Sequence, residues 1–352
     1  MSGAALSRER IEEVDAADQL SDILDLPDQL RDALWKAQSA GVEPHDAAGG
    51  LVIAGMGGSA IGGALARAAL GVRATRPIVL VRDYGLPAWT TPETTVLCAS
   101  YSGITEETLT AYEAATALGA RRVVVTSGGE LGRQAREDGV PVIPVAGGLR
   151  PRSAVAYMTV AALEVAAACG AGPSLHSEVD VAAAHAEALV RDWGPDAPHH
   201  SKAKALALAL HGTVPQIAGS GPTVPVAYRW KTQLNENAKI PAFAHELPEL
   251  DHNEIVGWEG ARELGAFSAV FLDDRDLHPR VRGRIELTRR LVDTEASSTH
   301  VVSSAGDTRT ERIFGLVLLG DLVSLYVAVL RGVDPSPVPV IDQLKREIFA
   351  SG

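Results

Sequence analysis

The stretch LVIAGMGGSAIGG at residues 51–63 joins a short apolar run to a glycine-rich turn. The residues that follow, ALARAAL at 64–70, are good helix formers, so this part of the chain predicts a strand, a tight turn and a helix. Glycines after a strand let the backbone approach a ligand closely, and the N-terminus of the next helix favours an anion. The segment therefore predicts an α/β fold with a candidate anion site at the turn.

The same pattern returns in the second half of the chain, where VPQIAGSG at 214–221 precedes a helical stretch at 228–237. Further apolar runs that predict strands lie at 78–81, 95–99, 122–126, 267–272 and 300–304. Strands of this kind that alternate with helices are typical of mainly parallel sheets covered on both faces. The chain therefore contains an internal repeat of two α/β units.

Each repeat ends in a long apolar stretch, at 154–170 and at 313–330. Both stretches contain a carboxylate and are shorter than the ~20 apolar residues that span a bilayer, so we expect buried core helices. A chain of 352 residues has room for about two domains of ~150 residues. The predicted organisation is a helical arm at 1–35, α/β domains at 36–172 and 200–335, and a C-terminal segment at 336–352.

Composition narrows the classes of function. The formal net charge of −12 supplies no basic field for binding nucleic acid. The start of the chain is polar and charged, without the apolar region of a secretory signal. Cys98 and Cys169 form no CxxC pair, which is typical of a protein in a reducing compartment. We expect a cytoplasmic protein that binds neither nucleic acid nor membrane.

A second motif, SYSGIT at 100–105, follows the predicted strand at 95–99 and opens a helix. Its three hydroxyls, on Ser100, Ser102 and Thr105, exceed what a helix cap needs. Hydroxyl donors, backbone amides and the helix dipole together make a good cradle for a phosphate group. The motif therefore predicts a phosphate-bearing ligand.

Two other interpretations of the first turn stay open at this point. Residues 55–60 (GMGGSA) fit a loose dinucleotide fingerprint, and Asp83 lies where a ribose-binding acid of an NAD-dependent dehydrogenase is expected. The turn is also compatible with a tight strand-to-helix connection without a ligand. A dinucleotide fold has no use for a second phosphate loop, so the SYSGIT motif weighs against the dehydrogenase.

The combination of GMGGSAIGG and SYSGITEET resembles the sugar isomerase (SIS) domain. Four separated motifs are similar to those of the bifunctional phosphoglucose/phosphomannose isomerases: PRSAV at 151–155, NENAKIP at 235–241, DHNEIVGW at 251–258 and IDQLK at 341–345. The resemblance covers the chain from about residue 50 onward. It implies two SIS domains, each a mainly parallel sheet between helices. It also implies isomerisation of glucose 6-phosphate, and of mannose 6-phosphate, to fructose 6-phosphate through a cis-enediolate.

The resemblance also assigns roles to particular residues. It places the phosphate group at Gly57, Gly58, Ser59, Ser100, Ser102 and Thr105. It places four side chains at the reacting carbons: Arg152, Glu236, His252 and Lys345. The pattern favours Arg152 over its neighbour Arg150, because the family motif has the arginine directly after a proline.

These residue types suit the chemistry. A carboxylate must move a proton between C2 and C1, and Glu236 fits that base. The enediolate needs a fixed cation, which Arg152 supplies. His252 is able to shuttle protons at neutral pH, and Lys345 to assist ring opening or hold a hydroxyl.

Expectations about partners complete the interpretation. The histidines show neither an HExxH pattern nor paired cysteines, and the resemblance implies a metal-free route, so we expect no metal and no cofactor. The resemblance further implies a homodimer in which His252 reaches the active site of the other subunit. A regulatory protein that senses sugar phosphates through SIS domains remains an alternative. Such a regulator usually carries a basic DNA-binding segment, and the acidic N-terminal arm is a poor candidate for one.

Overall fold

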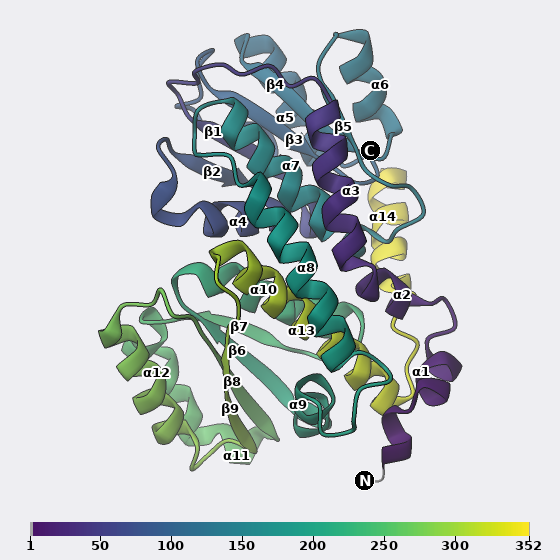
Figure 1. Cartoon of the computed structure of the whole chain (residues 1–352), viewed down its shortest axis with the longest axis vertical. Coiled ribbons are helices and arrows are strands. Elements are labelled where there is room, and N and C mark those ends of the chain that lie inside the picture. The colour runs from purple at the N-terminus through teal and green to yellow at the C-terminus, as the bar shows by residue number, and fades with distance from the viewer. Residues whose placement is uncertain (1–2, 352) are drawn as a thin grey trace.

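The computed structural model describes residues 3–351 and contains two parallel sheets, one in each half of the chain (Figure 1). The first sheet has the strand order β2-β1-β3-β4-β5. Its strands are β1 (Leu51–Gly55), β2 (Ile78–Val81), β3 (Thr95–Ala99), β4 (Arg121–Thr126) and β5 (Val142–Pro144). Every pair is parallel, so the glycine turn after β1 and the SYSGIT loop after β3 lie at the same edge.

The second sheet has the order β7-β6-β8-β9, again with every pair parallel. Its strands are β6 (Val214–Gly219), β7 (Phe243–Glu246), β8 (Phe267–Asp273) and β9 (Ser298–Ser303). The prediction of two mainly parallel α/β sheets is confirmed. Strand β5 was not predicted, because it has three residues and no long apolar run marks it.

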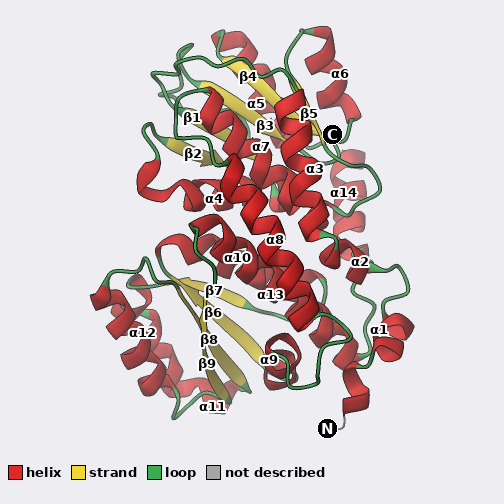
Figure 2. Cartoon of the chain, viewed as in Figure 1, coloured by secondary structure: helices red, strands yellow, loops and turns green. Residues whose placement is uncertain are grey.

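Helices cover the sheets and fill the space between them (Figure 2). In the first half they are α1 (Arg8–Val14), α2 (Gln19–Leu24), α3 (Leu26–Ser39), α4 (Gly57–Leu70), α5 (Glu106–Leu118), α6 (Gly129–Glu137) and α7 (Val155–Ala168). In the second half they are α8 (His176–Trp193), α9 (Lys202–Leu210), α10 (Val224–Glu236), α11 (Ala261–Leu264), α12 (Pro279–Val292), α13 (Arg309–Arg331) and α14 (Pro339–Ser351). Short 3₁₀ turns are η1 (Gly3–Leu6), η2 (Gly71–Arg73), η3 (Pro151–Ser153), η4 (Gly221–Thr223), η5 (Glu249–His252) and η6 (Glu254–Gly260).

The two halves share one continuous apolar core. Helices α4, α7, α8, α10 and α13 pack against one another between the sheets, and buried side chains of both halves belong to a single cluster. Helix α13 is long and apolar enough to cross a membrane by composition, but 94% of its most apolar window is buried inside the fold. It is therefore a core helix. Trp230 of α10 donates a hydrogen bond to the Leu316 carbonyl of α13 at 2.8 Å, which fixes this contact.

Two parts of the structure differ from the predicted division of the chain. The stretch between the two predicted α/β domains, at 173–199, connects them and contains the 18-residue helix α8, whose buried residues Val179, Ala182, Ala186 and Leu189 recur at helical spacing. The expected end of the N-terminal arm, at residue 35, lies inside α3, and α3 packs against α7 and α8. The arm and the connection are thus parts of the helical layers.

Candidate active site

The loop after β3 forms a compact hydroxyl cluster at the start of α5. The hydroxyls of Ser100 and Thr105 are 2.8 Å apart, and the Gly103 amide donates to Ser100 Oγ at 3.0 Å. Gly103 has a φ of 67°, and a Cβ there would lie 1.9 Å from the Gly128 carbonyl oxygen, so this position requires glycine. Ser102 is exposed, and its Oγ accepts from the Ile104 amide at 3.4 Å. The loop therefore presents hydroxyls and amides at a helix N-terminus.

The glycine turn after β1 is tied to this hydroxyl cluster. The Tyr101 amide donates to Ser59 Oγ at 3.1 Å, so the predicted phosphate-binding residues Ser59 and Ser100 belong to one edge of the sheet. Gly57 begins α4 with a φ of 50°. At Gly58 a Cβ would lie 2.6 Å from the Pro151 carbonyl oxygen. The glycine thus lets the start of α4 touch the turn η3, which carries Arg152.

Arg152 is 4% exposed and connects the two halves of the molecule. Its Nη1 lies 3.3 Å from Glu236 Oε2, and its Nε donates to Asn237 Oδ1 at 2.8 Å. Its Nη2 donates to the carbonyls of Pro335 (2.9 Å) and Ser336 (3.0 Å). Burial lowers the pKa of the Arg152 guanidinium, and the charge of Glu236 opposes that shift. An arginine with these partners stays protonated and fixed in position.

Glu236 is the last residue of α10, and its side chain is 30% exposed. The structure thus brings together two predicted side chains, Arg152 and Glu236, that lie 84 residues apart in sequence. The competing Arg150 has its Nη1 3.9 Å from Asp22 of α2 instead. A carboxylate that is open to a ligand and beside a fixed cation is suited to moving a proton while the cation holds developing negative charge.

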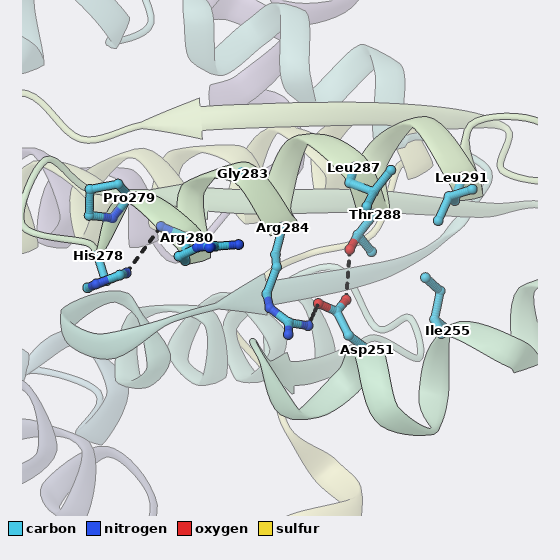
Figure 3. Close-up of a pocket in the computed structure, with 10 residues that line it drawn as sticks. All are labelled: Asp251, Ile255, His278, Pro279, Arg280, Gly283, Arg284, Leu287, Thr288 and Leu291. Atoms are coloured by element: carbon cyan, nitrogen blue, oxygen red, sulfur yellow. Dashed lines mark hydrogen bonds and ion pairs between the residues drawn. The ribbon is translucent and has the colours of Figure 1, made fainter.

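His252 lies on η5, on the second sheet's side of the molecule, and is exposed. Its turn is anchored to α12 through Asp251, whose carboxylate accepts from Arg284 at 3.0 Å and from Thr288 at 2.7 Å, as Figure 3 shows. Within the described part of this single chain, no hydrogen bond or ion pair joins His252 to Arg152 or Glu236. The histidine is therefore held on the surface, and its imidazole is accessible.

Lys345 lies on α14 and is exposed. Among residues 3–351 no hydrogen bond or ion pair brings its ammonium to the Arg152–Glu236 pair. The segment that leads to α14 is, however, held by Arg152 through the Pro335 and Ser336 carbonyls. The segment before α14 is thus part of the site, whereas the Lys345 side chain is exposed to solvent.

Sequence reasoning missed two supports of the site. Arg229 is 2% exposed, pairs with Asp321 at 2.6 Å and donates to the Arg152 carbonyl at 3.0 Å. The signal was Asp321, a carboxylate inside an apolar stretch, which requires a buried partner. The second support is Lys239 of the NENAKIP motif, whose Nζ donates to the Glu236 carbonyl. The sequence spacing alone does not show where this side chain points. No three His, Cys, Asp or Glu side chains among the described residues are grouped as a metal site requires.

Known proteins resemble this chain over nearly its whole length. A model of the bacterial phospho-glucose isomerase C-terminal SIS domain matches residues 199–348. A bifunctional phosphoglucose/phosphomannose isomerase of Caldicellulosiruptor bescii is 39% identical, over 93% of this chain and 97% of the relative. One of Aquifex aeolicus is 33% identical, over 89% and 94%. The solved structure of a hypothetical protein of Thermus thermophilus has the same fold, with a TM-score of 0.75 at 17% identity over 99% and 95% of the two chains.

Proposed function

This chain belongs to the bifunctional phosphoglucose/phosphomannose isomerase family, and from that premise we propose that its site interconverts glucose 6-phosphate and mannose 6-phosphate with fructose 6-phosphate. The observation that supports this assignment is the Arg152–Glu236 pair beside a turn that touches the hydroxyl-lined edge of the first sheet. The dehydrogenase and regulator alternatives are set aside by family membership.

In the proposed mechanism the phosphate dianion binds at the start of α4 and in the loop 100–105. Ser59, Ser100, Ser102 and Thr105 provide hydroxyls there, and Gly57 and Gly58 let the backbone approach. The other end of the sugar then reaches Glu236. This arrangement needs no cofactor, because the reaction moves a proton within one substrate.

The proton transfer follows from the two side chains. After the ring opens, Glu236 removes the proton from C2, the C–H electron pair forms the C1–C2 double bond, and negative charge develops on O1. Arg152 lies beside Glu236 and holds that charge. The O2 proton then moves to O1, the O2 electron pair forms the C2=O2 double bond, and the electron pair of the C1–C2 double bond takes the proton from Glu236 at C1, which gives the ketose. Glucose and mannose 6-phosphate differ at C2 alone, so both lead to the same enediolate.

His252 and Lys345 are assigned to ring opening and to contacts with the sugar hydroxyls. Because His252 is exposed and lies on a turn anchored to α12, we place it in the site of a second subunit of a homodimer. A twofold interface is self-complementary, so each subunit lends its histidine to the other. The protein acts in the cytoplasm, consistent with its two buried thiols.

The test is fructose 6-phosphate formation from each aldose, measured separately, with Glu236→Gln as the control. In deuterated water the enediolate route incorporates solvent deuterium at C2 or C1. Failure to convert either aldose would overturn the proposed function. Isomerisation at the wild-type rate by Glu236→Gln would instead contradict the base mechanism.

The shared site is tested by mixing Glu236→Gln with His252→Ala subunits. Each homodimer is expected to be nearly inactive. A heterodimer contains one site with both residues intact, so exchange restores up to about half of the wild-type activity per dimer. Absence of recovery, when subunit exchange has been demonstrated by mass, would place His252 within its own chain or outside the mechanism.

A further inference from the structure

The turn that follows α10 has an unusual backbone conformation. Lys239 lies three residues after Glu236 and has a φ of 54°, in the left-handed region that residues with a side chain rarely adopt. Such a conformation costs free energy and persists where surrounding contacts determine it. Here it turns the lysine back toward the end of α10, where its Nζ donates to the Glu236 carbonyl.

The same ammonium reaches the segment between α13 and α14. Lys239 Nζ donates to the Pro335 carbonyl at 3.0 Å, and Arg152 donates to that same oxygen at 2.9 Å. Arg331, at the end of α13, donates to the carbonyls of Ala238 and Lys239. Lys239 and Arg152 therefore hold the same Pro335 carbonyl, and Arg331 joins the turn after Glu236 to the end of α13.

We propose that Lys239 is a positioning residue for Glu236: its ammonium holds the end of α10 against the Pro335 carbonyl and so keeps the Glu236 carboxylate opposite Arg152. This inference rests on the proposed function, in which Glu236 is the base. Lys239 makes this contribution through the helix end and the Pro335 segment, and no contact with the substrate is required of it. A displacement of the base by about 1 Å is enough to lower the reaction rate about 100-fold.

The surroundings of Lys239 bring the pKa of its ammonium into the range where the enzyme would be assayed. The groups that face it are Arg152 from η3, Arg150 directly before η3, Glu236 from α10, Arg331 from α13 and Asp334 from the segment after α13. Burial lowers the pKa of Lys239 to about 8, and the Arg152 charge acts in the same direction. The ammonium is present below that pH and is lost as the pH rises through it. Its charge-assisted hydrogen bonds weaken accordingly.

Three variants test this role. In Lys239→Met we expect kcat to fall about 10- to 100-fold while KM changes less than about threefold, because the phosphate-binding loop is untouched. Lys239→Arg keeps the charge at every accessible pH, so its rate at pH 9 is retained and the alkaline limb of kcat moves up by about one pH unit or more. The matched control is Lys231→Met, which removes a lysine of α10 that lies over the Tyr228 ring. It should leave kcat and the pH profile unchanged.

A merely structural lysine would lower the melting temperature without moving the alkaline limb. An unchanged limb in Lys239→Arg, or a kcat within twofold of wild type in Lys239→Met, overturns the proposal. If Lys239→Met fails to fold, the Lys239→Arg pH profile decides. If the wild-type protein does not isomerise hexose 6-phosphates, the proposed function fails separately. Hydrogen exchange of residues 333–338 then tests whether Lys239 holds the Pro335 segment in place. Faster exchange in Lys239→Met supports this role, and unchanged exchange rejects it.

Discussion

The two sheets end in edges of the same topology and opposite chemistry. The strands β1 and β6 each run into a glycine turn and then a helix. At the first edge the loop after β3, residues 100–105, carries hydroxyls and no charged side chain. At the second edge the loop after β8 carries Asp274 and Asp276, and the hydroxyl of Thr223 is occupied by the Ser220 amide at 2.8 Å.

At the second edge the carboxylates of Asp274 and Asp276 are already paired with arginines of α13. Asp274 accepts from Arg312 Nε at 2.8 Å, and Asp276 accepts from Arg312 at 2.6 Å and from Arg309 at 2.7 Å. Asp274 and Arg312 are nearly fully buried. A phosphate dianion would meet carboxylates whose partners are already taken. The strand-turn-helix geometry thus occurs twice in the chain. The side chains at the two edges differ, and those of the first edge are the ones suited to an anion.

The same difference appears where each half touches the other. Arg152 meets Glu236 and Asn237 at the end of α10. In the other half, Arg309 lies against Gly71, just after α4, where a Cβ would be 1.6 Å from its Nη1. Helix α4 ends without a carboxylate in its last turn. At the second contact the carboxylate that pairs with Arg309 is Asp276 of the same half, and α4 supplies none.

The largest expected effect is at that base. Glu236→Gln should lower kcat by about three orders of magnitude with little change in folding or KM, since general base catalysis contributes at this level. The matched control, Glu246→Gln, changes a carboxylate at the end of β7 that lines a groove between the two halves. It should retain wild-type kcat. Near-normal turnover of Glu236→Gln in steady-state assays would remove the base from the mechanism.

The next largest effect is expected on KM, when the hydroxyls of the first edge are removed. Replacing Ser100, Ser102 and Thr105 together by alanine should raise KM for hexose 6-phosphates about 10- to 100-fold, because hydrogen bonds to a dianion are lost. Ser220→Ala, at the turn of the second half, should cost about 1 kcal/mol of stability and leave KM unchanged. Equal effects of the two changes on KM would mean that both edges bind phosphate.

A smaller effect on activity, with a clear effect on stability, is expected at the second edge. Asp274→Asn removes one partner of a buried ion pair and should cost about 3 kcal/mol in the free energy of unfolding, with kcat within twofold. Urea denaturation measures the first quantity and the isomerase assay the second. A loss of activity without a loss of stability would assign this edge a role in catalysis.

The pH dependence of stability should follow the same carboxylate. Burial raises the pKa of Asp274, but hydrogen bonds from Arg312 and Ser304 outweigh it and leave that pKa lowered. The stabilisation is therefore present above the unfolded pKa of about 4 and is lost as the pH falls through the lower folded value. Asp274→Asn should flatten this acid limb. An identical acid limb in both proteins would show that other carboxylates cause it.

The smallest expected effect is that of chelation. Neither edge groups metal ligands among residues 3–351, and the base mechanism moves a proton without a Lewis acid. Exhaustive EDTA treatment should leave the rate unchanged. Loss of activity on chelation, with recovery on adding Zn²⁺, would contradict the mechanism and reopen the choice of ligands.

Local chemistry explains how much the sequence predicted. The strands β1, β2 and β3 follow from short apolar runs bounded by turn residues, and the parallel sheets follow from their alternation with helices. The loop 100–105 was recognisable because three hydroxyls at a helix start need no long-range information. Helix α8 was hidden by flanking Gly, Pro and His residues, although its apolar positions have helical spacing.

The sequence by itself determined the repeat, the glycine turns and the resemblance that selected Glu236 and Arg152. The tertiary structure placed Arg152, and not Arg150, beside Glu236, turned Lys239 back onto the end of α10 and buried Arg229 against Asp321. Patterns along a chain report on periods of two or 3.6 residues. The partners of a buried charge come from elements tens of residues away. Which residue pairs with a buried charge is therefore fixed when the two halves pack around one core, because an unpaired charge there is costly.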